Sequence, residues 1–172
     1  MRVSVNRLTN ANLYVNGTSL LGMAEEIKIP GIKAKTEDHK GLGRFGTAEF
    51  PSGAEKLEAT VKWVSIYLEA ELQNSGMFQV NQYQARGNIE TYGPTGLLAQ
   101  TPGIWLFSAS LKDSGPVTFK QHQNVDKTTT LTVYHIEQYV GGVQTLLYDV
   151  LANIYVVNGK DQLAQFRANL GG

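Results

Sequence analysis

Apolar and polar residues alternate over much of this chain, a pattern that predicts strands with one face packed against a core. The segment 55–63 shows the alternation most clearly, because every second position from 57 onward is apolar. Residues 128–139 alternate in the same way, with Leu131 and Val133 on one face and threonines on the other. Two further strand candidates are 78–89 and 104–112.

Two glycine-containing turns divide the strands into hairpins. Gly141-Gly142 is a strong two-residue turn signal, so 128–139 and 143–157 are predicted to pair as the arms of one hairpin. Asn16-Gly17 is a second tight turn, between two short apolar runs near the start of the chain.

Only two segments have the pattern of a helix. The first is 65–74, and the second, 160–170, follows Asn158-Gly159 and carries Arg167 in its last turn. The predicted fold class is therefore mainly β: an antiparallel β-barrel or sandwich with a long protruding hairpin loop and one or two short helices. At 172 residues, the chain suits a single domain, 1–172.

Composition excludes several classes of protein. Lys+Arg and Asp+Glu each number 15, and this balance argues against tight sequence-independent binding of nucleic acid, which needs clustered positive charge. The lack of cysteine excludes disulfides, thiolate zinc sites and cysteine nucleophiles. No apolar run approaches the length of a membrane span, and the N-terminal segment lacks the apolar core of a signal peptide. We therefore expect a soluble protein that acts or assembles where it is made.

The polar, glycine-rich stretch 37–55 contains the pattern G-x-G-x-x-G over residues 41–46. A nucleotide loop with this pattern needs a buried strand before it and a helix after it. Residues 35–40 are too charged for such a strand, and Pro51 interrupts the place of the helix. We therefore interpret 37–55 as the mobile tip of a long hairpin and not as a phosphate site.

No local motif for catalysis is present. His39, His122 and His135 lack any close metal-ligand spacing, and no G-x-S-x-G elbow accompanies the serines. We therefore expect no enzymatic activity, no metal and no cofactor.

Long amphipathic strands in a small domain leave unpaired edges that invite pairing with other chains. Completing the sheet with neighbouring subunits in a ring removes those edges. We expect residues 1–12 to form an extended, unstructured arm that reaches into a neighbour.

Three parts of the chain resemble the major tail tube protein of contractile-tailed bacteriophages, which R-type contractile bacteriocins share. The first part is residues 12–17, followed by Leu21-Gly22 and 27–30. The second is the charged stretch with Lys35 and Glu37 that leads into Lys40-Gly41-x-Gly43. The third is the C-terminal segment, residues 157–163 and 167–171. The middle of the chain, 65–127, departs from the pattern.

The resemblance implies hexameric rings whose joined sheets form a hollow β-barrel, stacked into the inner tube of a contractile tail. The implied partners are further copies of the chain, the tail sheath protein, baseplate tube-initiator proteins and the tape-measure protein, with transient passage of DNA and no membrane anchoring. The implied location is the virion tail, assembled in the cytoplasm of the host bacterium.

The candidate site residues form three groups. The resemblance places the hairpin tip against the adjacent ring, and the stacking candidates are Lys40, Gly41, Gly43, Arg44, Phe45, Gly46 and Phe50. Candidates for the lumen are Thr128, Thr130 and Thr132, whose hydroxyls would neither trap nor strongly repel phosphates, together with Lys56 and Glu58. Asp161, Leu163, Phe166 and Arg167 would dock the final helix.

Each group has an alternative. The hairpin tip would be a plain surface loop in a monomer, Lys56 and Glu58 would equally suit an outer face, and core packing is the favoured role for Leu163 and Phe166. Two other functions also stay open: a tube component of a bacterial injection or secretion system, and a monomeric β-sandwich module that binds carbohydrate or peptide.

Overall fold

The structure, a computed structural model, describes residues 4–74 and 76–171. Residues 1–3 of the expected arm and Ser75 at the expected helix end lie outside the described residues. The strands are β1 (Val5–Val15), β2 (Thr18–Ser19), β3 (Ala24–Lys28), β4 (Ala34–His39), β5 (Ala48–Ala54), β6 (Leu57–Trp63), β7 (Val80–Gly93), β8 (Gly96–Asp113), β9 (Lys127–Val140), β10 (Val143–Asp149), β11 (Ile154–Val157) and β12 (Lys160–Asp161). The helices are α1 (Leu68–Asn74) and α2 (Ala164–Asn169).

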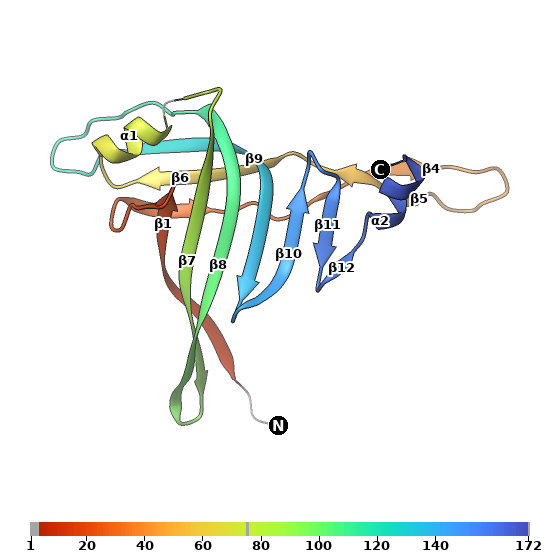
Figure 1. Cartoon of the computed structure of the whole chain (residues 1–172), viewed down its shortest axis with the longest axis horizontal. Coiled ribbons are helices and arrows are strands. Elements are labelled where there is room, and N and C mark those ends of the chain that lie inside the picture. The colour runs from red at the N-terminus through yellow and green to blue at the C-terminus, as the bar shows by residue number, and fades with distance from the viewer. Residues whose placement is uncertain (1–3, 75, 172) are drawn as a thin grey trace.

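One large antiparallel sheet dominates the molecule (Figure 1). Its order is β12-β11-β10-β9-β8-β7-β1-β2, and β6 joins it through β9 and carries β3 on its other side. Strands β4 and β5 form a separate two-stranded hairpin that projects from the body (Figure 1). The predicted fold class is confirmed: the chain is mainly β and antiparallel, with a protruding hairpin and two short helices.

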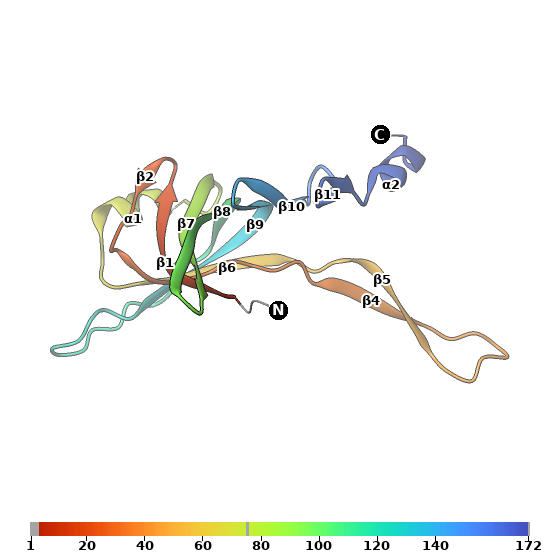
Figure 2. The ribbon, with the colours of Figure 1, turned by 90° about the horizontal axis from the view of Figure 1, so that it is seen from below.

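The core lies between two layers, which Figure 2 shows edge-on. One layer contains β1, β7, β8 and the second half of β9, and the other contains β3, β6 and the first half of β9. The predicted alternation in β6 is confirmed, since Leu57, Ala59, Val61 and Trp63 are all buried. Within the first layer, Tyr83 on β7 and Phe107 on β8 are register partners, and their rings stack on the core side with centroids 5.1 Å apart.

Strand β9 belongs to both layers because it contains a bulge at Tyr134. Its residues 127–133 pair with β6, whereas residues 135–140 pair with β10. Opposite β8, the register moves from Val133 to His135 and leaves Tyr134 as an extra residue. Because of this extra residue, the buried side chains of β9 are at odd-numbered positions before the bulge, as in Leu131 and Val133, and at an even-numbered position after it, Ile136.

The hairpin predicted at Gly141-Gly142 is confirmed, with both glycines at positive φ. The single return strand expected over 143–157 is wrong, because the chain turns after Asp149 and returns as β11. The Asp149 carboxylate accepts hydrogen bonds from the backbone N–H groups of Leu151 and Ala152 at 2.9 and 2.8 Å. Aspartate favours such turns by this local bonding, and here it ends the strand.

The prediction of an unstructured N-terminal arm is wrong for the described residues. From Val5 onward the chain forms β1, which pairs with β7 from Val5↔Tyr92 to Val15↔Tyr83. These residues form a ladder with β7 on one side, interrupted by a register shift between Leu8 and Asn10. On the other side, β2 pairs with β1 only at Tyr14 and Val15.

Both helices are shorter than predicted. Helix α1 begins at Leu68 instead of residue 65. At the C-terminal end, Lys160 and Asp161 pair with β11 as β12, so α2 spans only Ala164–Asn169.

Candidate assembly surfaces

The seven stacking candidates lie at or near the tip of the β4–β5 hairpin. Lys40, Gly41, Gly43, Arg44, Phe45 and Gly46 lie in the connection between the two strands, and Phe50 lies on β5. The side chains of Leu42 and Phe45 are fully exposed. A strand follows the glycines, so no helix N-terminus is available for a phosphate. Contact of this tip with another ring stays a prediction.

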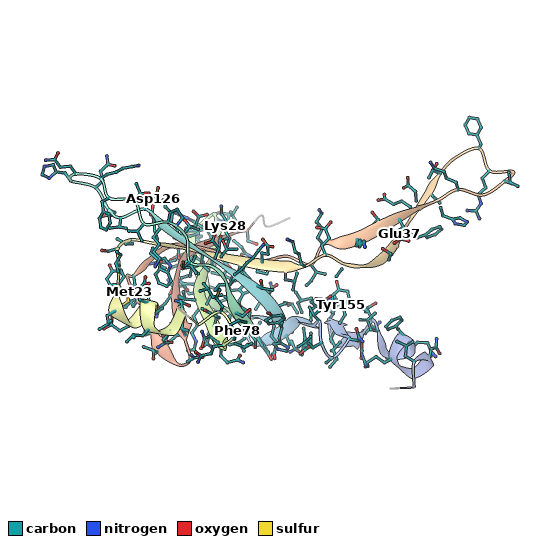
Figure 3. The ribbon with its side chains drawn as sticks, turned by 90° about the horizontal axis from the view of Figure 1, so that it is seen from above. Met23, Lys28, Glu37, Phe78, Asp126 and Tyr155 are labelled. Carbon is teal, nitrogen blue, oxygen red and sulfur yellow. The ribbon has the colours of Figure 1, made fainter. Side chains whose placement is uncertain are left out.

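The two arms of the hairpin are joined to each other at its base. The Glu55 N–H donates to the Lys33 carbonyl at 2.8 Å, and the two side chains form an ion pair at 3.0 Å. Near the tip, the rings of His39 and Phe50 meet edge to face, with centroids 6.0 Å apart. Figure 3 shows the hairpin leaving the body, with Glu37 well beyond the two layers.

The lumen candidates lie together on the polar face of β6 and β9. The register places Glu58 opposite Thr132 and Thr60 opposite Thr130. Lys62 lies opposite Thr128 in the same ladder. Lys56, which precedes β6, bonds to the Glu58 carboxylate at 2.9 Å. The structure therefore brings two groups of residues, whose paired members are 66 to 74 positions apart in sequence, onto one surface.

The charges of this face are largely neutralised in pairs. Glu58 accepts hydrogen bonds from Lys112 and Lys56, and these hold the pKa of its carboxyl below the usual value. Lys62 pairs with Glu25 at 3.2 Å, which raises the pKa of Lys62. The resulting face is polar but carries little net charge.

The C-terminal segment is tied down by Asp161 and Arg167. The Arg167 guanidinium donates to the Asp161 carboxylate and, at 2.8 Å, to the carbonyl of Asn153. The hydrogen bonds from Arg167, with another from the Leu163 N–H at 3.0 Å, hold the pKa of Asp161 below its usual value. These two residues therefore join α2 to β12 and to the turn before β11.

Leu163 and Phe166 do not pack in the core, contrary to the alternative considered for them. Phe166 is 50% exposed, and α2 contains no buried residue. Both side chains instead line an apolar groove of about 490 Å³ that runs between the hairpin base and α2. Ile32, Ala34 and Pro51 form its hairpin side, and Tyr155 lies with Leu163 and Phe166 on the other.

A polar network on β9 and β10 was not predicted from the sequence. His135 contacts the carboxylates of Asp149 and Glu137 at 3.0 and 2.9 Å. Burial raises the pKa of Glu137, but hydrogen bonds from Tyr139, His135 and Gln144 outweigh it and leave the pKa lowered. Two carboxylates and one imidazole therefore cross-link the two strands on the sheet face away from the core.

Within residues 4–74 and 76–171, no cluster of three or more His, Asp or Glu could hold a metal ion. None of the helices in those ranges is long and apolar enough to cross a membrane.

Large apolar side chains are exposed at several separate places. Contiguous exposed apolar surface marks interaction sites, whereas scattered single residues are normal. The most exposed examples lie on the hairpin tip, between β2 and β3, before β7, in the loop before β9, after β10, on α1 and directly after α2: Leu42, Phe45, Leu21, Phe78, Phe119, Leu151, Leu68, Leu72 and Leu170. The molecule thus offers apolar surface at both of its ends.

Comparison with known proteins gives a consistent result. The profile of the family described as phage tail tube protein FII matches residues 5–171. A curated relative, the tail tube protein of Escherichia phage P2, is 21% identical over 175 residues, which cover 96% of each protein.

Two solved structures from an extracellular contractile injection system are also similar. The sheath/tube terminator in the extended state has a TM-score of 0.50 and 14% identity, over 75% of this chain and 92% of that chain. A chain of the sheath-tube complex has a TM-score of 0.49 and 15% identity, over 75% and 87% of the two chains. The similarity to the sheath/tube terminator concerns the fold alone. Because the family profile spans nearly all of the sequence, this chain belongs to the phage tail tube protein FII family.

Proposed function

We propose that this protein forms hexameric rings that stack into the hollow inner tube of a contractile tail. The observation that carries the proposal is the open sheet: within residues 4–74 and 76–171, no strand pairs with the outer edge of β1 from Val5 to Asn12. An exposed edge of this length invites pairing with another chain. A ring of head-to-tail copies closes such a sheet, and stacked rings give a filament.

Stacking is assigned to the hairpin tip. Residues 40–46 and Phe50 project far beyond the body, and the exposed Leu42 and Phe45 offer apolar surface to a docking ring. The glycines give the tip the freedom to fit its partner. In the free subunit this surface would face water.

The polar face of β6 and β9 is assigned to the lumen. Its threonines and paired charges suit a channel through which DNA passes without binding, because clustered positive charge would retain the phosphates. A Thr130→Cys variant tests this assignment in a protein without native cysteine. In assembled tubes this thiol should react with a small maleimide but not with a maleimide on a large polymer, and in free subunits it should react with both. Equal labelling by the large reagent in tubes would place Thr130 outside the lumen.

The remaining partners follow from the same role. The tube would lie inside the sheath protein, grow from baseplate initiator proteins and enclose the tape-measure protein. It would be assembled in the host cytoplasm and would function in the virion tail, as a conduit through the host envelope. We propose a structural and not an enzymatic protein.

A second candidate is the tube of a bacterial contractile injection or secretion system. The fold shared with the sheath/tube terminator of such a system favours this possibility over a monomeric binding module. Neighbouring genes distinguish the two tube functions: portal and terminase genes indicate a phage, and effector and immunity genes indicate an injection machine.

Negative-stain electron microscopy of the purified protein tests the proposal. We expect rings or hollow tubes, formed without added nucleotide or metal ion. A strictly monomeric species at high concentration would contradict both tube functions. A persistent requirement for nucleotide would instead support an enzymatic function.

A further inference from the structure

Helix α1 and the apolar groove lie at opposite ends of the molecule. Figures 1 and 2 show α1 at one end, and α2 with the β4–β5 hairpin at the other. At the α1 end the two layers close over the core, where Ala70 is buried. At the other end the layers diverge around the groove, beside Tyr155 in Figure 3. The two surfaces therefore meet only between different copies of the chain.

Helix α1 presents an apolar side that the core does not use. Leu68 and Leu72 are 69% and 70% exposed. Their i, i+4 spacing places them on the same side of the helix, and Ile66 just before it is also exposed. Ala70 and Asn74 face the interior instead. This seven-residue helix therefore has one apolar side that stays largely exposed in its own subunit, within residues 4–74 and 76–171.

The groove has the complementary chemistry. Its walls are aliphatic and aromatic, with Ile32 and Pro51 facing Leu163 and Phe166. The Asp161–Arg167 pair holds the α2 wall in place from behind. No part of the described chain fills the groove, so these side chains would otherwise face water.

Charge at the two surfaces is also complementary. Glu69 lies between the exposed leucines of α1, and Lys35 is the strand residue next to Ala34 on β4, outside the groove lining itself. Neither residue forms an ion pair within residues 4–74 and 76–171. The other lysine beside the groove, Lys33, already pairs with Glu55.

We propose that α1 of one subunit docks into the groove between the β4–β5 hairpin base and α2 of the next subunit. Leu68 and Leu72 enter the groove, and Glu69 pairs with Lys35 at its rim. The contact is head-to-tail, so each subunit gives one helix and receives another around the ring. This inference rests on the proposed ring function and names the surfaces that close the ring.

Cysteine cross-linking tests the contact, since the native chain contains no cysteine. Leu72→Cys and Phe166→Cys, mixed in equal amounts, assembled and oxidised, should give at least tenfold more covalent dimer than either variant alone. The double variant should give a ladder of covalent oligomers. Leu98→Cys, on the β7–β8 hairpin, replaces Leu72→Cys in the control mixture and should give no excess dimer. Electron microscopy of each sample shows whether tubes are present.

The possible failures are distinguishable. Normal tubes without the Leu72–Phe166 cross-link would overturn the contact and leave the ring function intact. Efficient cross-linking of Leu72→Cys alone would show that the α1 helices of two subunits contact each other, and this result would also overturn the proposed contact with the groove. Failure of the wild-type chain to form any ring or tube would refute the proposed function together with the contact.

A charge exchange gives an independent test. Glu69→Lys should weaken assembly at least fivefold, and adding Lys35→Glu should restore it to within about twofold of wild type. Both positions are exposed, so the circular dichroism of the free subunit should not change. If the second substitution does not restore assembly, the proposed pairing is wrong.

Discussion

Replacing Phe45 with serine separates assembly from folding. Phe45 is fully exposed at the hairpin tip, and no element of the body packs on it. Surface substitutions of this kind change stability by less than about 0.5 kcal/mol. The urea midpoint and the melting temperature of the free subunit should therefore stay at their wild-type values.

The same substitution should weaken stacking strongly. Burial of a phenylalanine side chain contributes about 1.5–3 kcal/mol, and each 1.4 kcal/mol changes an equilibrium constant about tenfold. If docking of the next ring buries Phe45, each added subunit loses that contribution. The critical concentration for tube growth should then rise by about 10- to 100-fold.

The critical concentration can be measured by sedimentation of tubes over a series of protein concentrations. Glu37→Ser is a suitable control, because it alters the same hairpin without removing apolar surface. An unchanged critical concentration for Phe45→Ser would refute a stacking role for the tip. A large loss of subunit stability would also refute the reasoning, because it would mean that the tip packs on its own subunit.

Three further outcomes test the fold and its electrostatics. Phe107→Ala should destabilise the subunit by about 3–5 kcal/mol in urea unfolding, since Phe107 is buried, and a loss below 1 kcal/mol would contradict the core assignment. Gly115→Ala should lower stability by at least about 1 kcal/mol, because Gly115 has a φ of +72° and an added Cβ would overlap the Thr128 carbonyl oxygen. A neutral result would contradict the loop conformation. Although burial raises the pKa of Glu137, its hydrogen bonds hold it below the ordinary 4.5. The stabilising contribution of Glu137 is therefore present above pH 4.5 and is lost as the pH falls through the lowered pKa. Glu137→Gln should accordingly flatten the acid side of the pH–stability profile. A profile of the variant that runs parallel to that of the wild type would contradict the network.

Local patterns were sufficient to predict several strands and the main hairpin, but residues 37–39 and 48–54, which were expected in a mobile tip, belong to β4 and β5. In β6, alternation alone identified the buried face, because a strand that covers a core on one side needs an apolar residue at every second position. Gly141-Gly142 identified the β9–β10 turn, since few other residues adopt positive φ at two successive positions. The β10–β11 break was missed because it depends on a hydrogen-bonding role of the Asp149 side chain, which alternation does not report.

The candidate surfaces were only partly predictable. Simple counting outward from Gly141-Gly142 would pair His135 with Tyr148, but a register shift between Gln144 and Leu146 pairs it with Asp149. The His135 network therefore follows from an irregularity that the sequence does not mark. The groove was also missed, because its walls come from segments more than 100 positions apart, such as Ile32 and Phe166. The polar residues of β6 and those of β9 were recognised only as two separate groups. Local patterns do not show that the two strands pair, as in Thr60 opposite Thr130, because the paired residues are far apart in sequence.

The bulge at Tyr134 has a mechanical consequence. Because β9 runs without interruption through both layers, its covalent backbone connects the two layers of the subunit. In a sandwich of two independent sheets, an axial thrust on one sheet is opposed only by side-chain packing between them. Here the same thrust must stretch a peptide chain or break the ladders that join β9 to β6 and β8. Sliding of one layer past the other is thereby resisted within each subunit, before any neighbour contributes to the rigidity of the wall.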